Sequence, residues 1–480
     1  MDLVLGIDLG TSYFKVGLFD GHGRLKGLGR VPLRAERGDG SRYELPVQSF
    51  LGTLNHGIQS ACRQADASTG QIRGVSYSSQ ANSFLLLDSV DQPLCPLILW
   101  PDQRAATVDP AVSELWHRTD FNYVTGVGLR SNEFCVNKLR WFQQQQRRIW
   151  ERVGRIMTIS DYLVLLLTGE RLGDSGTGSM LGLWHLQADE WWDTALDLVG
   201  LTRQQVSTLF RPGSVIGEVC SKGARVFGLP VGIPVAAGGL DHHVAAIGAG
   251  ADRIAAFSAS VGTVLACLRY VTCFEPVLGC CMGPAEADQR YYKLAFNENG
   301  AASLECFQRE HAPGTDFDEL VLRGAQVEIG SEGLIALPGA RPEGRATFSH
   351  VSGCHREGHF VRAILESSAA SLLSLVGLLC GDDRPKRIVA TGGGARSDLW
   401  LQIMADLLSV ELVTSACSEP ACMGAGLMAA VAAKWYPTVE QASEAWVAID
   451  KQFEPIAENH AAYLRWHEYY VREVERSTHD

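Results

Sequence analysis

Residues 6–12 read Gly-Ile-Asp-Leu-Gly-Thr-Ser and combine glycine, hydroxyl and carboxylate groups in one short stretch. An apolar run before it and an alternating run after it predict a β-hairpin whose turn contains Thr11 and Ser12. Glycine lets a ligand approach the backbone closely, and backbone N–H groups and the two hydroxyls can donate to phosphate oxygens. Asp8 can hold Mg²⁺ through water, because Mg²⁺ keeps several waters and takes few carboxylates. Taken alone, an ordinary glycine-rich hairpin remains the better explanation of the pattern.

A second stretch near the middle of the chain repeats this plan. Residues 254–268 again read as strand, Gly-Thr turn and strand, with Gly262 and Thr263 in the turn. Internal similarity of this kind indicates two related halves. Two such turns facing each other across a cleft would hold a nucleoside triphosphate between two domains.

Asp241 ends a strand of small residues and begins a helix. This position predicts a carboxylate at the carboxyl edge of a sheet, where open α/β folds bind their ligands. A helix N-terminus favours the ionised carboxylate, which a base needs when it takes a proton from a hydroxyl. Phosphoryl transfer requires such a base together with charge neutralisation on the phosphate. A helix N-cap is an equally good explanation of Asp241, and both stay open.

Residues 392–395, Gly-Gly-Gly-Ala, follow a predicted strand and precede a helix with Ser397 as its predicted N-cap. The loop lacks both the Gly-Lys-Ser/Thr of a P-loop and the spacing of a dinucleotide-binding fingerprint. Bare backbone is suited to a flat ring, and the place of this loop beyond the second Gly-Thr turn favours adenine. A tight strand-to-helix turn is the alternative.

Two polar clusters follow apolar strands, the first with Gln80 and Asn82 and the second with Trp100 and Asp102. Amides and carboxylates suit a polyhydroxy substrate, because each hydroxyl both donates and accepts hydrogen bonds. A tryptophan face suits the C–H face of a sugar. Ordinary polar loop residues are at least as good an explanation for each position taken separately.

Composition excludes several classes of function. The 480 residues are 46% hydrophobic and 20% charged, which is ordinary for a globular protein, and they suffice for two or three domains. The net charge of −12 without a basic block argues against a nucleic-acid-binding surface. No apolar run approaches the roughly 20 residues that span a bilayer, the longest candidate being residues 371–380. The chain begins with a strand instead of a signal sequence, and its 13 cysteines lack zinc-like spacing, so we expect a cytoplasmic protein with reduced thiols.

Predicted strands alternate with predicted helices in both halves, which indicates an α/β protein. The helices are expected over residues 45–66, 132–150, 160–168, 191–198, 242–248, 359–379, 397–408, 421–434 and beyond residue 455. The stretch 274–289 reads as rich in loops.

These motifs together resemble the FGGY carbohydrate kinases, which include xylulokinase, glycerol kinase and gluconokinase. The likeness covers nearly the whole chain. Further matching segments are residues 98–104, 138–141, 161–163, 167–170, 212–217, 228–241, 338–342, 359–366 and 393–406. The resemblance implies two actin-like (ribonuclease H-like) domains with a duplicated β-sheet core and a central interdomain cleft. Residues 1–249 would carry the sugar site, the first phosphate turn and the catalytic Asp, and residues 250–480 the second phosphate turn and the adenosine site.

The resemblance also implies a role for each matched residue. Asp241 looks like the general base that acts on the sugar hydroxyl, and Asp8 like the residue near Mg²⁺ and the transferring phosphate. The remaining implied contacts are Thr11, Ser12, Gly262 and Thr263 for phosphate, Gly393, Gly394, Ala395 and Ser397 for adenosine, and Gln80, Asn82, Trp100, Asp102 and His242 for the substrate.

The predicted function is phosphorylation of a sugar hydroxyl by ATP with Mg²⁺, and a ketose such as a pentulose is the first candidate substrate. A polyol or a sugar acid is the alternative, and a non-catalytic sensor or a chaperone-like ATPase is a more distant one. The chain has Ala81 and Asn82 where xylulokinases usually carry Met and His, and Pro101 where an aromatic residue or Asn is usual, so the sugar stays open. The expected partner is a small sugar, with no nucleic acid or membrane, and a homodimer is an open alternative.

Overall fold

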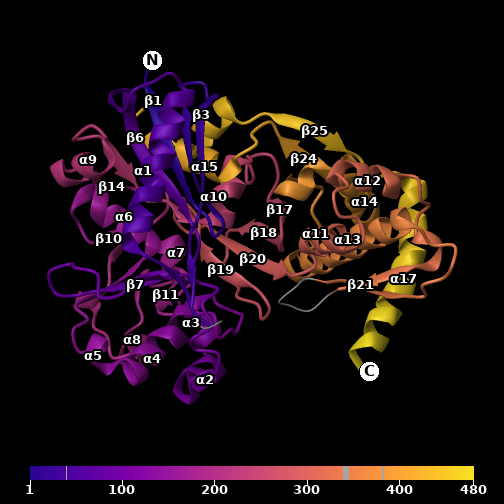
Figure 1. Ribbon diagram of the computed structural model, residues 1–480, viewed down its shortest axis with the longest axis horizontal. Coiled ribbons are helices and arrows are strands. Elements are labelled where there is room, and N and C mark those ends of the chain that lie inside the picture. The colour runs from indigo at the N-terminus through magenta and orange to yellow at the C-terminus, as the bar shows by residue number, and fades with distance from the viewer. Residues whose placement is uncertain (39–40, 339–344, 381–382, 480) are drawn as a thin grey trace. The chain divides into compact units, whose positions relative to one another are not determined.

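The computed structural model describes residues 1–38, 41–338, 345–380 and 383–479, which group into two compact units (Figure 1). Unit 1 comprises Met1–Gly248, Tyr270–Lys293 and Cys417–Val447, and unit 2 comprises Ala249–Arg269, Leu294–Ala416 and Ala448–Asp480. The domain boundary after residue 249 stays a prediction. Of the segment 338–342 that contributed to the resemblance, residues 339–342 lie outside the described residues.

Unit 1 is built on a seven-stranded sheet of order β14-β15-β6-β1-β2-β3, with β16 also paired to β6. Its strands are β1 (Leu3–Leu9), β2 (Tyr13–Phe19), β3 (Leu25–Pro32), β6 (Ile72–Ser79), β14 (Val215–Glu218), β15 (Pro234–Ala236) and β16 (Gly239–Leu240). A second sheet contains β4 (Glu36–Arg37), β5 (Tyr43–Leu45), β8 (Leu97–Ile98), β7 (Phe84–Leu87) and β9 (Arg155–Thr158), in that order. Two short pairs are β10 (Leu172–Asp174) with β13 (Thr208–Phe210), and β11 (Trp184–His185) with β12 (Glu190–Trp191).

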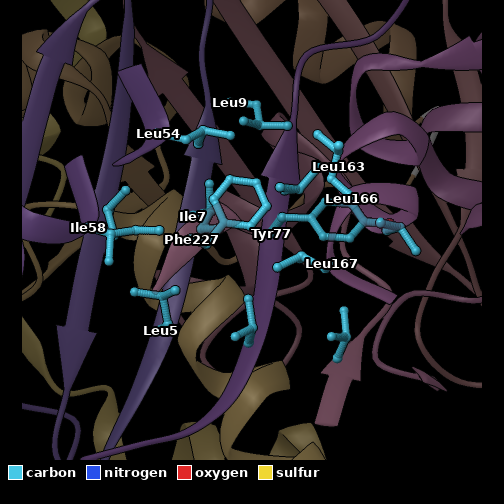
Figure 2. Close-up of a cluster of buried hydrophobic side chains, with 14 of the residues drawn as sticks. Leu5, Ile7, Leu9, Leu54, Ile58, Tyr77, Leu163, Leu166, Leu167 and Phe227 are labelled. Atoms are coloured by element: carbon cyan, nitrogen blue, oxygen red, sulfur yellow. The ribbon is translucent and has the colours of Figure 1, made fainter. Parts of the chain in front are cut away.

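Helices cover the main sheet of unit 1 because its central strands are apolar on both faces. Every residue of β1 is buried, as expected for a strand between two layers. Figure 2 shows Leu5, Ile7 and Leu9 of β1 in one apolar cluster with Leu54 and Ile58 of helix α1. Helix α15 packs against β1 and β6. The helices of unit 1 are α1 (Val47–Gln64), α2 (Pro110–His117), α3 (Phe121–Thr125), α4 (Cys135–Gln145), α5 (Arg147–Trp150), α6 (Ile159–Thr168), α7 (Ser175–Ser179), α8 (Asp193–Leu198), α9 (Ser221–Phe227), α10 (Asp241–Gly248), α15 (Pro420–Ala432) and α16 (Val439–Trp446).

Unit 2 contains a sheet in which β18 (Leu265–Val271), β17 (Phe257–Val261), β23 (Arg387–Thr391), β24 (Glu411–Ser415) and β25 (Ile449–Phe453) follow one another. Its helices are α11 (Ala302–His311), α12 (Phe317–Ala325), α13 (Glu357–Cys380), α14 (Asp398–Leu408) and α17 (Ala457–His479). The other strands of this half of the chain are β19 (Cys281–Pro284), β20 (Tyr291–Asn297), β21 (Ile335–Leu337) and β22 (Thr347–Ser349).

The two main sheets share one plan, which agrees with the predicted duplication. In each, the first hairpin strand pairs antiparallel with its successor, β1 with β2 and β17 with β18. The same strand pairs in parallel on its other side, β1 with β6 and β17 with β23. Both predicted hairpins are therefore present, and each lies beside the parallel strand that ends in a second predicted motif.

Two expectations need correction. The helix predicted over residues 132–150 is two helices, α4 and α5, because Gln146 leaves the helical conformation. The stretch 274–289 is irregular as predicted, apart from strand β19, whose four residues are all buried.

The second correction concerns helix α13. Its presence confirms the helix predicted over residues 359–379, but its apolar part extends beyond residues 371–380, the longest apolar run expected from the sequence. The helix has 24 residues, and by length and mean hydropathy (1.8) it could cross a membrane, but 78% of its apolar window is buried inside the protein. It carries Arg362 and Glu366, which form an ion pair of 3.0 Å. These features are those of a core helix, and no other helix among the described residues passes the same test.

Candidate active site

Three neighbouring parallel strands of unit 1 end at one edge of its sheet. In the register, Ser78 of β6 lies between Asp8 of β1 and Gly239 of β16. One residue further, Ser79 lies between Leu9 and Leu240. The carboxyl ends of the three strands therefore present Asp8, Gln80 and Asp241 side by side, at the edge where open α/β sheets bind ligands.

Asp241 is the first residue of α10 and is half-buried. Its Oδ1 accepts the backbone N–H of His242 at 2.8 Å, so the carboxylate lies at the helix N-terminus as predicted. The strand before it must pass close to β6, and a Cβ on Gly238 would lie 1.9 Å from the carbonyl oxygen of Tyr77. The small residues before Asp241 therefore allow the chain to pass close to β6 and to place Asp241 at the carboxyl edge of the sheet.

Asp8 is buried, and its environment raises its pKa. Ser78 Oγ donates to Asp8 Oδ1 at 3.3 Å, and Lys15 Nζ lies 3.6 Å from Oδ2. Burial raises the pKa of Asp8 to about 6, the Lys15 charge opposes this rise, and the negative charges of Asp241 and Glu419 add to it. Lys15 Nζ also pairs with Glu419 at 2.9 Å. The effect of Asp241 on the Asp8 pKa indicates that the two carboxylates are near enough to repel each other.

This pair of carboxylates fits a hard cation that brings most of its own ligands. Among the described residues there is no group of three or more His, Cys, Asp or Glu that could hold a metal ion. Mg²⁺ needs no such cage, because it usually binds through one or two carboxylates, water and substrate phosphates. Two neighbouring carboxylates would also gain from a cation that offsets their repulsion.

The turn of the first hairpin, residues 10–12, is held in place by hydrogen bonds from two other segments of the chain, one containing Gln80 and the other Trp100. The side-chain amide of Gln80 is buried and donates to the carbonyl oxygens of Leu9 and Gly10, each at 3.1 Å. Thr11 is half-buried and accepts a 2.8 Å hydrogen bond from Trp100 Nε1. Ser12 is exposed. We refer to residues 10–12 as the phosphate turn.

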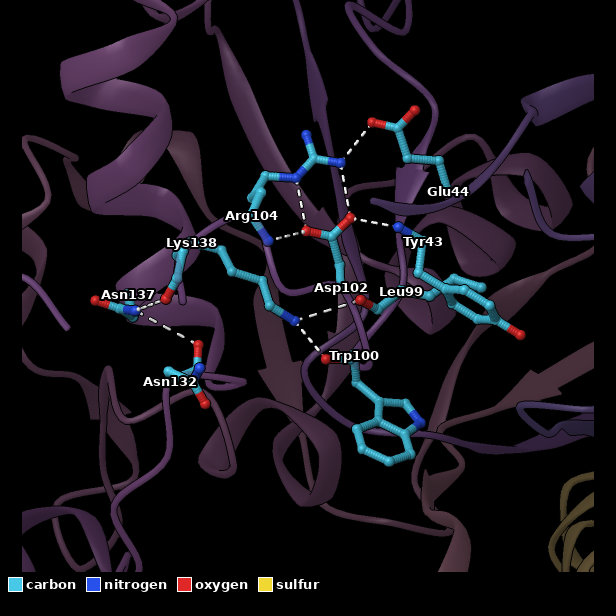
Figure 3. Close-up of polar contacts among 10 residues, drawn as sticks. Tyr43, Glu44, Leu99, Trp100, Asp102, Arg104, Asn132, Asn137 and Lys138 are labelled. Atoms are coloured by element: carbon cyan, nitrogen blue, oxygen red, sulfur yellow. Dashed lines mark hydrogen bonds and ion pairs between the residues drawn. The ribbon is translucent and has the colours of Figure 1, made fainter. Parts of the chain in front are cut away.

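Two of the predicted substrate contacts are committed to bonds within the protein. Asn82 has φ +59°, a left-handed conformation that Asn adopts more easily than most residues, and its Oδ1 accepts the N–H of Cys135. Asp102 accepts from Arg104 Nε at 2.7 Å and Nη2 at 2.8 Å, and from the N–H of Tyr43 (Figure 3). Both side chains therefore shape the loops around the sheet edge, and their roles toward a substrate stay predictions.

Lys138 is a residue to which the sequence assigned no role. It lies on α4 with its side chain fully buried, and Nζ donates to the carbonyl oxygens of Leu99 at 3.3 Å and Trp100 at 2.5 Å (Figure 3). Burial lowers the pKa of Lys138 to about 8, although the Asp102 charge opposes this change. The available signal was a lysine among the apolar positions of a helix, between the buried Val136 and Leu139.

Unit 2 brings its two predicted nucleotide motifs together. The β17–β18 turn exposes Thr263, and β23 pairs with β17 so that Thr391 lies opposite Ser260. The chain beyond β23 therefore runs beside the turn: a Cβ on Gly392 (φ +89°) would lie 2.7 Å from the Val261 carbonyl oxygen. Glycine is required there by both the conformation and the close approach.

The rest of this loop leaves bare backbone open. A Cβ on Gly393 would have no heavy atom within 4 Å, whereas one on Gly394 would lie 2.4 Å from Val261 Cγ1. Ser397 accepts the N–H of Trp400 at 3.2 Å, which confirms the predicted N-cap of α14. The backbone at Gly393 is therefore open to a ligand, whereas Gly392 and Gly394 on either side of it are closely packed against Val261.

Comparison with known proteins gives consistent results for both halves of the chain. The model of the N-terminal domain of the FGGY family of carbohydrate kinases matches residues 3–248, and that of the C-terminal domain matches residues 295–433. A xylulose kinase of Staphylococcus epidermidis is 28% identical over 484 residues, covering 98% of this chain and 96% of the relative. A gluconokinase of Bacillus subtilis is 26% identical and covers 88% of this chain and 86% of its own.

The structural comparison agrees. The crystal structure of a ligand-bound xylulose kinase from Lactobacillus acidophilus superposes with a TM-score of 0.89 at 20% identity, covering 99% of this chain and 98% of the other. This likeness confirms the predicted α/β fold with two actin-like domains.

Proposed function

Because the chain belongs to the FGGY family of carbohydrate kinases, we propose that it transfers the terminal phosphoryl group of ATP to a hydroxyl of a ketose. The enzyme is a phosphotransferase with an alcohol group as acceptor. A pentulose such as xylulose is the first candidate, since relatives that match nearly the whole chain are xylulose kinases.

The observation that carries this proposal is the pair of carboxylates at the carboxyl edge of the unit 1 sheet. Asp241 is half-buried and lies at a helix N-terminus, where the ionised form is favoured. In the proposed reaction its free carboxylate oxygen takes the proton from the attacking sugar hydroxyl. Oδ1 keeps its bond to the His242 N–H and so fixes the direction of the base.

Asp8 has a different role in this proposal. With a pKa of about 6 it is mainly ionised at neutral pH, and its charge suits a cation held through water. Mg²⁺, when bound there, would offset negative charge on the phosphates. Lys15, between Asp8 and Glu419, keeps a positive charge at the same edge.

We propose that the nucleotide contacts are shared among three turns. The phosphate turn offers the Thr11 and Ser12 hydroxyls, and the β17–β18 turn offers the exposed Thr263 beside Gly262. The open backbone at Gly393 supports a contact with the adenine ring, with Gly394, Ala395 and Ser397 forming the remainder of that turn.

The polar loop around Asp102 supports a neutral sugar over a sugar acid. A sugar carboxylate would call for an arginine, but the Arg104 side chain is 5% exposed and already pairs with both Asp102 and Glu44. A gluconate-type kinase remains the second candidate, because a gluconokinase is among the relatives of similar identity. In either case Trp100 and His242 are proposed to line the sugar site with Gln80, Asn82 and Asp102.

A panel of ketoses, polyols and sugar acids, assayed for ADP release with Mg-ATP, tests the proposal. We expect the highest kcat/KM for a pentulose, and NMR of the product identifies the phosphorylated hydroxyl. A sugar acid as best substrate would select the second candidate. ATP binding without turnover of any sugar would contradict the kinase function and favour a sensor.

We also propose a cytoplasmic location, which fractionation of the source cells tests, and a homodimer, which sedimentation tests.

A further inference from the structure

Trp100 is held at three points by residues from different parts of unit 1. Its backbone N–H donates to Ser83 Oγ at 2.9 Å, and its carbonyl oxygen accepts from Lys138 Nζ at 2.5 Å. Its indole Nε1 donates to Thr11 Oγ1 at 2.8 Å. Figure 3 shows the Lys138 contact with the backbone of this loop. Peptide and side chain are thus fixed together, although Trp100 lies outside regular secondary structure.

A second chain of hydrogen bonds joins Trp100 to the phosphate turn. Ser83 Oγ, which accepts from Trp100, donates to Gln80 Oε1 at 2.8 Å. The Gln80 amide in turn donates to the carbonyl oxygens of Leu9 and Gly10. The direct bond and this relay both begin at Trp100 and end at residues 9–11, so neither the loop nor the turn can move without breaking one of them.

Burial makes this network costly to disrupt. Ser83 and Lys138 have no exposed surface, and Gln80 is 2% exposed. A polar network away from water holds its geometry tightly, since each broken bond leaves an unpaired buried group.

The indole bond also determines what the Thr11 hydroxyl can do. An indole N–H is a donor only, so the Thr11 oxygen must accept from it. The hydroxyl hydrogen is then directed away from Trp100 and is available to another acceptor, such as a phosphate oxygen.

We propose that Trp100 is a positioning residue for the phosphate turn: its indole N–H orients the Thr11 hydroxyl, and sugar bound at the indole is thereby coupled to alignment of the phosphate. Ser83 and Lys138 act as positioning residues for Trp100. The inference rests on the proposed function in placing sugar and phosphate at this edge, but the Trp100–Thr11 contact is testable without any reaction.

The kinetic test is a double-mutant cycle on the full chain. Trp100→Phe should lower kcat/KM for ATP about five- to tenfold, the size of one lost hydrogen bond, and Thr11→Val, which also removes the hydroxyl that faces the phosphate, should lower it at least as much. The double variant should be no worse than the poorer single one, because both remove the same bond. Thr11→Ser retains the oxygen that accepts from the indole, so its loss of kcat/KM should be smaller than that of Thr11→Val. Trp435→Phe, a half-buried tryptophan of the same unit, is the matched control.

A binding and spectroscopic test distinguishes failure of this inference from failure of the proposed function. The chain has 11 tryptophans, so the indole ¹⁵N–¹H signal of Trp100 can be assigned as the one lost in Trp100→Phe. Thr11→Val should shift that signal upfield in proton frequency and Thr11→Ser should leave it nearly unchanged. Calorimetry of ADP binding should rank the variants by affinity in the same order as kcat/KM for ATP ranks them.

Additive losses in the double variant, or a Trp100 signal that does not respond to Thr11→Val, would overturn the inference even for an active kinase. If the wild type phosphorylates no sugar but the signal shifts and ADP affinity falls as expected, the Trp100–Thr11 coupling stands and the proposed function fails.

Discussion

The two carboxylates at the edge of the unit 1 sheet differ in how far they are exposed to solvent. Asp8 is buried and has a raised pKa, whereas Asp241 is half-buried at the start of a helix. Two carboxylates in different surroundings can take different roles, one beside a cation and one as a base.

Replacement of the proposed base tests that division of roles. Asp241→Asn should lower kcat about 10²–10⁴-fold, the usual contribution of general acid–base catalysis, and should keep ADP affinity within about twofold. Steady-state kinetics and calorimetry measure the two effects. Asp197→Asn, at an exposed site on α8, is the control. Turnover at the wild-type rate in Asp241→Asn would show that another group takes the proton.

A second residue-scale prediction concerns stability. Asp161 is fully buried beside Asp174, and burial followed by the Asp174 charge raises its pKa from 3.8 to about 7. The folded state therefore binds this proton more tightly than the unfolded state. The stability that it contributes is complete at low pH and is lost as pH rises from about 4 to about 7.

Asp161→Asn should remove this pH dependence. An amide keeps an acceptor oxygen for the Thr158 N–H of the capping box but carries no charge. We expect the Tm of the variant to exceed that of the wild type at about pH 8, and the difference to shrink toward about pH 5. Thermal unfolding at both pH values measures it, with Asp197→Asn again as control. A parallel shift at both pH values would contradict the assignment.

At the scale of elements, both halves place the proposed site residues where a parallel strand ends beside a hairpin turn. In unit 1 this is β6 beside β1, and in unit 2 it is β23 beside β17. Parallel neighbours end at the same edge, so one register fixes the position of two loops at once. The glycines of the β23–α14 loop allow its backbone to pass close to Val261.

This arrangement predicts that two adjacent glycines differ in what they tolerate. Gly393→Ala should leave the Tm unchanged, since its Cβ meets no atom within 4 Å, but should weaken ADP binding about tenfold by occupying the open surface. Gly394→Ala should lower the Tm, because its Cβ would collide with Val261. Gly353→Ala, also with nothing within 4 Å, is the control for both measurements. Unchanged ADP affinity in Gly393→Ala would remove this loop from the nucleotide site.

At the scale of the whole molecule, the main sheet of each unit carries some of the residues that we propose contact the nucleotide. The described residues contain no group of three or more metal-ligating side chains. A chelator should therefore abolish turnover while leaving the Tm of the protein alone within about 1 °C, since a ligand absent from the fold adds no linked stability. Thermal unfolding with and without EDTA measures this, and turnover restored by Mg²⁺ is the control. A large fall in Tm would indicate a structural metal.

Much of the fold and part of the site could be predicted from local sequence. Apolar runs around Gly-Thr turns determined both hairpins, and Asp241 after a strand of small residues determined its place at a sheet edge. These features follow from residues close together in the chain, where spacing alone decides which side chains share a face.

Tertiary structure decided what those side chains touch. Trp100 meets Thr11 across 89 residues of sequence, and Lys138 of α4 reaches the carbonyl oxygen of Trp100. The same packing commits Asp102 to Arg104 and Asn82 to the start of α4. Such contacts depend on strand register and on how separate elements pack, which no local spacing encodes. For that reason the sequence indicated which groups lie at the sheet edge, and only the folded chain decided how they are held there.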